Sequence, residues 1–401
     1  MIGVLSAQAD FVNFETPQVN PIAISPDHST LSVCNTADQR IEIFDLNGSY
    51  PHPSGSITVG MDPVSVSYRN NNEIWVINQL SDSVSIVDLS KRLVTATLQT
   101  DDEPADVLFA GTPQRAYISC SQSDTVLVFN PDDITAPPVR IPIEGEDPRA
   151  LCKSPDGESV YVTIFESGNN STIIAGGSGD DVIDFPPNAV SDPRGPYGGI
   201  NPPPNNGNSF QPRKKRGNPG APPVGLIVKK DRQGKWRDDN NADWSEMVSG
   251  PLASVSGRVN GWDLIDNDLA IIDTRSGTVS YTTGLMNICM ATAVNPVSGE
   301  LLTVGTDALN EMRFEPNLNG IFVRVMYGIT DPVTLENQIG DLNPHLDYAS
   351  HTTTSMNREQ SIGDPRGITW NADGDLAYVT GMGSNNVIVV DASGQRPSKA
   401  G

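Results

Sequence analysis

A segment of about 42 residues, containing four short extended stretches, recurs along this chain. Its first stretch is repeated at residues 21–27, 63–70, 104–111, 148–156, 289–296 and 365–373. Its second stretch reads "IWVIN", "AYISC", "VYVTI" and "AYVTG" in four of the copies. These stretches are short, rich in β-branched and aromatic residues, and bounded by turn residues such as Gly, Pro, Asn and Asp, which is typical of β-strands. The chain is therefore predicted to be all-β.

Four strands per repeat and a period near 42 predict a β-propeller of four-stranded blades, with six repeats visible. One such sheet cannot bury both of its faces alone, whereas a radial arrangement buries each sheet against its neighbours. A parallel solenoid fits less well, because its repeats are shorter and have fewer strands. The 36 glycines and 32 prolines also indicate many turns and argue against a helical protein.

The sixth repeat lacks a fourth strand, because its third strand, "NVIVVD", is followed by the polar end "GQRPSKAG". Two explanations are open. Residues 11–17 ("FVNFETP") could add the strand and give a closed six-bladed ring. Alternatively, the propeller is of a seven-bladed type that is truncated at the C-terminus of this sequence, which is the interpretation we favour.

The segments "VYVT", "AYVT" and "VSIVDL", with "SPDG" between first and second strands, resemble the YVTN-type propeller repeat of bacterial exported proteins. The resemblance covers roughly residues 20–175 and 260–395. The second half, including "DPRGITWNADGDLAYVTGMGSNNVIVVDASG", is similar to a group of long periplasmic proteins. In that group, as the resemblance implies, the propeller precedes a c-type cytochrome domain.

Charge and hydropathy limit the partners and the cellular location that the protein can have. The formal net charge of −23 disfavours nucleic acid as a partner. No apolar run approaches the roughly 18 residues of a membrane-spanning helix. Residues 7–9 ("AQA") fit the small residues before a secretory cleavage site, so residues 1–9 are interpreted as the remnant of an export signal. Residues 10–401 then form a single propeller domain of a periplasmic or secreted protein.

Two insertions interrupt the repeat, at about residues 170–262 and 329–362. The first separates the second and third strands of blade four. The second follows residues 321–328, which are assigned as the fourth strand of blade five, with 310–316 as its third strand. Links of these two kinds emerge on the same face of a propeller, so the insertions predict one elaborated binding face.

Within the first insertion, residues 224–237 are predicted to form a hairpin. The basic cluster Arg213, Lys214, Lys215 and Arg216 could dock an acidic protein partner or a further domain of the same polypeptide. The competing interpretation is that this cluster is simply solvated.

Two loops of the first insertion are candidate calcium sites. "GGSGDDVID" (176–184) matches one copy of a calcium-binding nonapeptide, with Asp181 as a ligand. In "DDNNADWSE" (238–246), Asp239, Asn241 and Asp243 alternate as in the first half of a calcium loop. Flexible acidic turns are the alternative for both, and the sequence predicts no other cofactor within this chain.

Arg149 and Arg366 each follow an Asp-Pro step at the start of a first strand. These strands are expected to line the central channel, so the two guanidinium groups could hold an anion at its mouth. Alternatively, each pairs with its neighbouring acid, Asp147 or Asp364. Such acid-Pro steps recur, also at Asp62 and Glu103, and are explained by turn geometry without catalysis.

No catalytic triad order, phosphate-binding loop or nucleophile motif is present. We therefore expect a non-catalytic propeller that acts as a binding or interaction scaffold. The resemblance to the long periplasmic proteins implies that it is part of a longer protein with an electron-transfer (cytochrome c) domain. The alternative is a lactonase-like propeller hydrolase with an active site at the channel mouth, because propellers host both functions.

Overall fold

The computed structural model describes residues 17–174, 189–190, 192–200, 215–217, 225–309, 321–348, 350 and 352–397. The chain divides into two compact units. Unit one comprises residues 1–109 and 113–141, and unit two comprises residues 110–112 and 142–401. All strand pairs in the described residues are antiparallel, and helices are short, as the composition predicts.

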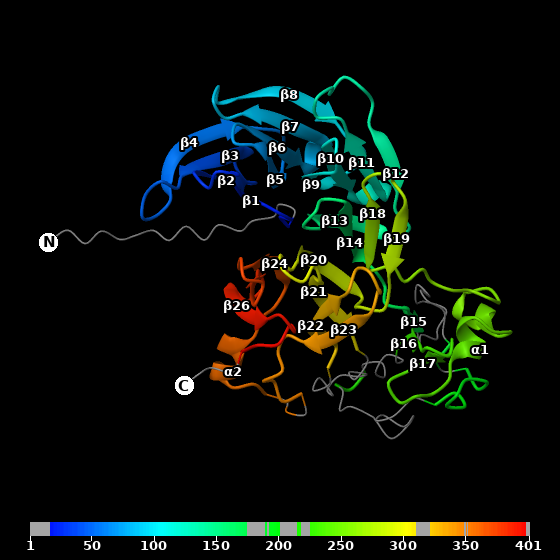
Figure 1. The fold of residues 1–401 in the computed structure, drawn as a ribbon. Coiled ribbons are helices and arrows are strands. Elements are labelled where there is room, and N and C mark those ends of the chain that lie inside the picture. The colour runs from blue at the N-terminus through cyan, green and yellow to red at the C-terminus, as the bar shows by residue number, and fades with distance from the viewer. Residues whose placement is uncertain are drawn as a thin grey trace. The chain divides into compact units, whose positions relative to one another are not determined.

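Unit one contains three four-stranded sheets, each with its strands hydrogen-bonded in chain order (Figure 1). Blade one consists of β1 (Ile22–Ile24), β2 (Thr30–Asn35), β3 (Arg40–Asp45) and β4 (His52–Thr58). Blade two consists of β5 (Pro63–Asn70), β6 (Glu73–Asn78), β7 (Ser83–Asp88) and β8 (Leu93–Gln99). Blade three consists of β9 (Pro104–Ala110), β10 (Arg115–Cys120), β11 (Thr125–Phe129) and β12 (Val139–Pro142).

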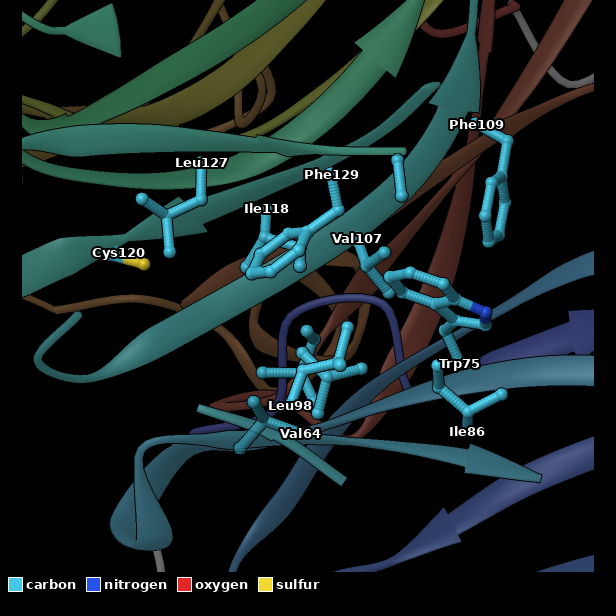
Figure 2. Close-up of a cluster of buried hydrophobic side chains, with 13 residues drawn as sticks. Val64, Trp75, Ile86, Leu98, Val107, Phe109, Ile118, Cys120, Leu127 and Phe129 are labelled. Carbon is cyan, nitrogen blue, oxygen red and sulfur yellow. The ribbon is translucent and has the colours of Figure 1, made fainter. Parts of the chain in front are cut away.

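Adjacent blades of unit one bury their apolar faces against each other. Between blades two and three, the fully buried Trp75 packs edge-on against Phe109 and Phe129, with ring centroids 5.4 and 6.4 Å away. Figure 2 shows Trp75 among the aliphatic side chains of this cluster, with Ile86 and Val107 beside it. Burial of sheet faces between blades is the packing that the repeat predicts.

Unit two contains the other three blades. Blade four consists of β13 (Glu146–Lys153), β14 (Ser159–Glu166), β18 (Leu269–Asp273) and β19 (Val279–Thr282). Blade five consists of β20 (Ile288–Val294), β21 (Leu301–Ala308), β22 (Val323–Thr330) and β23 (Asn337–Asp341). Blade six consists of β24 (Pro365–Trp370), β25 (Leu376–Gly381) and β26 (Asn386–Asp391), and helix α2 (Ser355–Gln360) precedes it.

The predicted fold class is confirmed: the sheets have the strand number and order of β-propeller blades. In the described residues the sixth blade has three strands, as its sequence predicts. Residues 11–16 lie outside the described residues, so the closed six-bladed ring and the truncated seven-bladed propeller both stay predictions. The export remnant at residues 1–9 and the single domain at 10–401 also stay predictions.

The strand assignment within blade five was wrong. Residues 321–328 were assigned as the fourth strand, but β22 pairs with β21 and is the third strand. The fourth is β23, "NQIGD", which pairs with β22 from Met326↔Asp341 to Thr330↔Asn337. An outermost strand packs little of its surface, so its sequence carries a weak apolar signal. The predicted insertion at 329–362 therefore contained a blade strand, and the segment between β23 and β24 is 342–364.

The first insertion has a fold of its own. Its strands β15 (Ser171–Ile174), β16 (Leu226–Lys230) and β17 (Trp236–Arg237) form a separate three-stranded sheet. Helix α1 (Ser245–Val248) and a 3₁₀ turn at Ala253–Ser256 follow. Figure 1 shows these elements gathered apart from the strands of blade four. The predicted hairpin is confirmed by the pairs Lys229↔Arg237 and Lys230↔Trp236.

Candidate functional site

The described part of the insertion is built around its own hydrophobic core. The largest members, Trp236 and Trp244, are fully buried and pack with the aliphatic residues of β15, β16 and α1. Trp262 contacts Trp236 in a tilted arrangement, with ring centroids 5.8 Å apart. Because burying large side chains offsets the entropy of ordering a long segment, the described part of the insertion is folded.

Asp238 organises the loop between β17 and α1, and its side chain is buried. One carboxylate oxygen accepts the backbone N–H groups of Asn240 and Ala242, both at 2.9 Å. The other accepts the hydroxyl of Tyr197 at 2.7 Å and the indole N–H of Trp244 at 3.1 Å. Four donors on one buried carboxylate fix this loop against the core of the insertion.

Polar contacts fix the insertion to blades four and five. Asn169 donates its side-chain amide to Asp307 of β21 at 2.8 Å, and Lys229 of β16 lies 3.6 Å from the same carboxylate. Asn170 donates to Asp266, just before β18, at 2.6 Å. Asn169 and Asn170 both have a positive φ, the left-handed conformation that Asn tolerates best among residues with a side chain. The chain thus turns sharply where the insertion leaves β14.

The insertion and the two blades enclose a pocket of about 890 Å³. Its size is at the upper end of the range for small-molecule pockets and is enough for a short peptide segment. Its walls are polar and charged, and no aromatic side chain lines it. The lining residues are Asn169, Asn170, Lys229, Lys230, Asp231, Arg232, Arg237, Asp238, Asn241, Asp266, Thr283, Gly284, Glu336, Asn337 and Ile339.

Some of the charged groups in the pocket neutralise each other. Arg237 donates to Asp231 at 2.7 Å, and Lys230 donates to Asp263 outside the pocket at 2.5 Å. By contrast, Arg232 and Glu336 are exposed and form no ion pair within the described residues. With four basic and four acidic side chains, the lining is balanced, on a protein of net charge −23. Such a lining suits a ligand with groups of both signs.

Asp266 is a buried acidic group of the pocket, with 8% of its surface exposed. One carboxylate oxygen is bonded to Asn170, and the other is buried and makes no hydrogen bond within the described residues. Burial raises the pKa of Asp266, against the opposing effect of Lys229. An unpaired buried acceptor is costly, so this carboxylate lowers the local stability of the segment that holds it.

Asp268 lies two residues further along and is fully buried. It accepts the backbone N–H of Leu285 at 2.8 Å, and the thiol of Cys289 lies 3.6 Å from its other oxygen. Burial raises the pKa of Asp268 to about 7, and the negative charge of Asp266 adds to the shift. This carboxyl group therefore changes its protonation near neutral pH.

The calcium site predicted at 238–246 stays a prediction, and the structure gives the contacts of its residues. Asp243 pairs with Lys235 at 3.2 Å and accepts the backbone N–H of Ser245, and Asp238 accepts four donors. Asp239 is exposed, and Asn241 contributes to the pocket lining. Of the described residues, no three His, Cys, Asp or Glu side chains are grouped to hold a metal ion. Asp181 lies outside the described residues.

The predicted basic cluster is described only in part. Lys215 and Arg216 are exposed, whereas Arg213 and Lys214 lie outside the described residues. Neither Lys215 nor Arg216 lines the pocket. The described residues of the segment 342–364 contribute no lining residue either. The cations of the pocket come instead from the hairpin of β16 and β17.

The structure brings Arg149 and Arg366 together around one aromatic ring. Their guanidinium carbons lie 4.7 and 5.4 Å from the centroid of Phe165. Each also pairs with its neighbouring acid, Arg149 with Asp147 at 2.8 Å and Arg366 with Asp364 at 2.7 Å. The arginines are thus held in fixed positions by both ion pairing and cation–π contact.

The acid-Pro steps form a repeated turn. Asp62, Glu103, Asp147 and Asp364 all have φ between 50° and 61°. In three of them the backbone C=O accepts an N–H from the residue after the second strand, at 2.9–3.0 Å, and the donors are Gln79, Ser121 and Met382. This hydrogen bonding gives these acids a structural role at the start of each first strand.

Reasoning from sequence did not single out Asp266, Asp268, Lys229 or Lys230. The segment "DNDLAIID", in which acids directly precede an apolar strand, was the available signal for the two aspartates. The lysines lie within the predicted hairpin, but nothing in the sequence indicates that they face blade five.

No family model matches this sequence, and no curated protein matches it. Among solved structures, hydrazine synthase of Kuenenia stuttgartiensis superposes with a TM-score of 0.55 at 15% identity, covering 96% of this chain and 80% of that one. A protein from Bacteroides fragilis, provisionally named a 6-phosphogluconolactonase, gives a TM-score of 0.50 at 10% identity, with coverage of 96% and 84%. The periplasmic gluconolactonase of Pseudomonas aeruginosa gives 0.48 at 13% identity, with coverage of 94% and 83%.

At these identities the likeness shows the fold alone. The chain is a β-propeller protein, as its blades indicate. In the part of the chain that the structure describes, no helix is long and apolar enough to cross a membrane.

Proposed function

We propose that this protein is an exported, non-catalytic β-propeller that binds a protein partner, or a further domain of its own polypeptide, through the insertion of blade four and its pocket. The folded insertion is the observation that carries this proposal. The described residues of this insertion, which lies between two neighbouring strands, are ordered around a core of tryptophans, and they wall a charged pocket against blades four and five. Insertions of this length are uncommon in compact domains and are usually either functional or disordered, and the described part of this one is folded.

The partner that the sequence favours is an electron-transfer domain of the c-type cytochrome class. This part of the proposal rests on the resemblance of the repeats to those of long periplasmic proteins. The same resemblance, with residues 7–9, supports a periplasmic or secreted location. The cysteines are compatible with this location, because all four are free and three of them are buried within strands.

Site-specific photo-crosslinking in the organism that encodes this chain tests the proposal. A photoreactive phenylalanine at Arg232, on the exposed rim of the pocket, should form a covalent adduct with the partner or the further domain. The matched control places the same residue at Leu93, a 46% exposed position on β8 of unit one. Adducts from both positions alike, or from neither, would contradict the proposal.

The alternative, a lactonase-like hydrolase, has one observation in its favour. Arg149, Arg366 and their acids gather polar groups around Phe165, as binding of an anionic substrate would require. We expect the purified protein not to accelerate opening of gluconolactone or 6-phosphogluconolactone, followed by proton release at constant pH. Hydrolysis that is at least ten-fold faster than the buffer rate and is lost in the Arg366→Gln variant would establish the alternative instead.

A further inference from the structure

The strand β23, orange in Figure 1, is the outermost strand of blade five. At its ends, Leu342 donates to the C=O of Val325, and Glu336 accepts from the N–H of Asp331. Bonded residues alternate in an antiparallel pair, so positions 338 and 340 also bond to β22. The backbone groups of Asn337, Ile339 and Asp341 therefore point away from the blade.

This outward edge has no neighbour among the described strands, because β23 ends the order β20-β21-β22-β23. An unpaired edge is a template for an added strand. The sequence of β23, "NQIGD", contains no Pro or Lys to prevent such pairing. Ile339 is 43% exposed and gives the edge one apolar contact.

The edge lies beside the pocket. Asn337 and Ile339 both line the pocket, and residues two apart on a strand point to the same face. A further strand beside β23 would therefore direct every second side chain toward the same pocket. Its backbone would bond to β23 while its side chains met the charged walls.

The charges of the pocket determine what those side chains should be. The exposed carboxylate of Glu336 calls for a donor, whereas the exposed guanidinium of Arg232 calls for an acid. An all-acidic segment would be repelled by Asp231, Asp238, Asp266 and Glu336. An all-basic segment would be repelled by the lysines and arginines.

We propose that an extended segment of the partner adds to blade five as a fifth strand along β23 and places alternating basic and acidic side chains in the pocket. This inference rests on the proposed function and gives it a recognition mode: main-chain pairing supplies affinity and alternate side chains supply specificity.

Binding of synthetic peptides, measured by fluorescence anisotropy, tests this inference. The probe is a labelled peptide Thr-Lys-Val-Glu-Val-Lys-Thr, whose charged residues all lie on one face of a strand. We expect saturable binding that is at least ten-fold tighter than binding of two controls. One control carries N-methyl groups on alternate amides, which removes strand pairing, and the other has Glu in place of both Lys residues.

Two protein variants complete the test. Glu336→Gln keeps the shape of an exposed pocket side chain and removes its charge, and it should weaken binding at least five-fold. Ile339→Pro removes an N–H that points away from β22, and it should abolish binding, whereas Gln338→Thr, on the opposite face of β23, should bind as the wild type does. Equal binding of the N-methylated peptide, or unchanged binding by Glu336→Gln, would overturn the inference.

The outcomes also separate this inference from the proposed function. If photo-crosslinking at Arg232 captures the partner while no peptide binds, the face is a binding surface but strand addition is wrong. If the protein alone forms a dimer that competes with the peptide, the occupant is a second copy, and the inference about a partner is overturned. If neither crosslink nor peptide binding occurs, the proposed function fails as well.

Discussion

Raising the pH from 5 to 8 should destabilise unit two of the wild-type protein by about 3 kcal/mol relative to its Asp268→Asn variant. Burial raises the pKa of Asp268 from 3.8 to about 7. Between these two values the folded protein holds a proton that the unfolded chain has released. Stability that depends on Asp268 is therefore highest on the acidic side and falls as the pH rises, until the folded carboxyl group is also ionised near pH 7.

The surroundings of Asp268 explain why its pKa is raised and why stability falls as the pH rises. The buried carboxyl group faces the thiol of Cys289, the hydroxyl of Ser167, the backbone N–H of Leu285 and the like charge of Asp266. No cation pairs with it among the described residues. Charging it without a counter-ion is costly, and the hydrogen bonds only partly compensate.

Urea unfolding at pH 5, 6, 7 and 8, followed by tryptophan fluorescence, measures this effect. Unit two contains Trp236, Trp244, Trp262 and Trp370, so its unfolding dominates the signal. The Asp266→Asn variant removes the neighbouring negative charge and should move the midpoint of the pH dependence to lower pH. A difference between wild type and Asp268→Asn that stays constant from pH 5 to 8 would show that Asp268 ionises normally.

The blades could be predicted from sequence because their strands carry two independent signals. The segments of β6, β7 and β25 are short apolar runs, and each recurs at a fixed distance from an acid-Pro step. Repetition makes each weak strand prediction support the others. The same reasoning failed in blade five, because β23 is polar. The more apolar residues 321–328 were assigned as the fourth strand instead.

The candidate site was less predictable, because it depends on contacts between distant segments. The position of the insertion was evident from the interrupted repeat, and a hairpin at residues 224–237 was predicted within it. However, Asp266 lines a pocket only because Asn170 and the hairpin of β16 and β17 lie beside it. Likewise, the repeat places Arg149 and Arg366 at equivalent positions, but it does not reveal that Phe165 lies between them.

Replacing Asp238 with Ala should unfold the described part of the insertion locally while the blades stay folded. The substitution leaves two backbone N–H groups, the indole N–H of Trp244 and the hydroxyl of Tyr197 without their buried acceptor. Each bond to a charged acceptor contributes about 1.5–3 kcal/mol, so we expect the insertion to lose on the order of 4 kcal/mol of local stability. Local opening of this kind does not require global unfolding.

Hydrogen–deuterium exchange resolved by peptide measures this separation of insertion and blades. Residues 225–265 should lose protection by about a hundred-fold or more in Asp238→Ala, while peptides from β20, β21 and β24 keep theirs. The matched variant Asp239→Ala alters the neighbouring exposed carboxylate and should exchange like the wild type. Because the insertion supplies one wall of the pocket, Asp238→Ala should also abolish the crosslink at Arg232 and the binding of the mixed-charge peptide. If binding survives while residues 225–265 exchange freely, recognition belongs to the blades alone, and the insertion cannot be the contact surface.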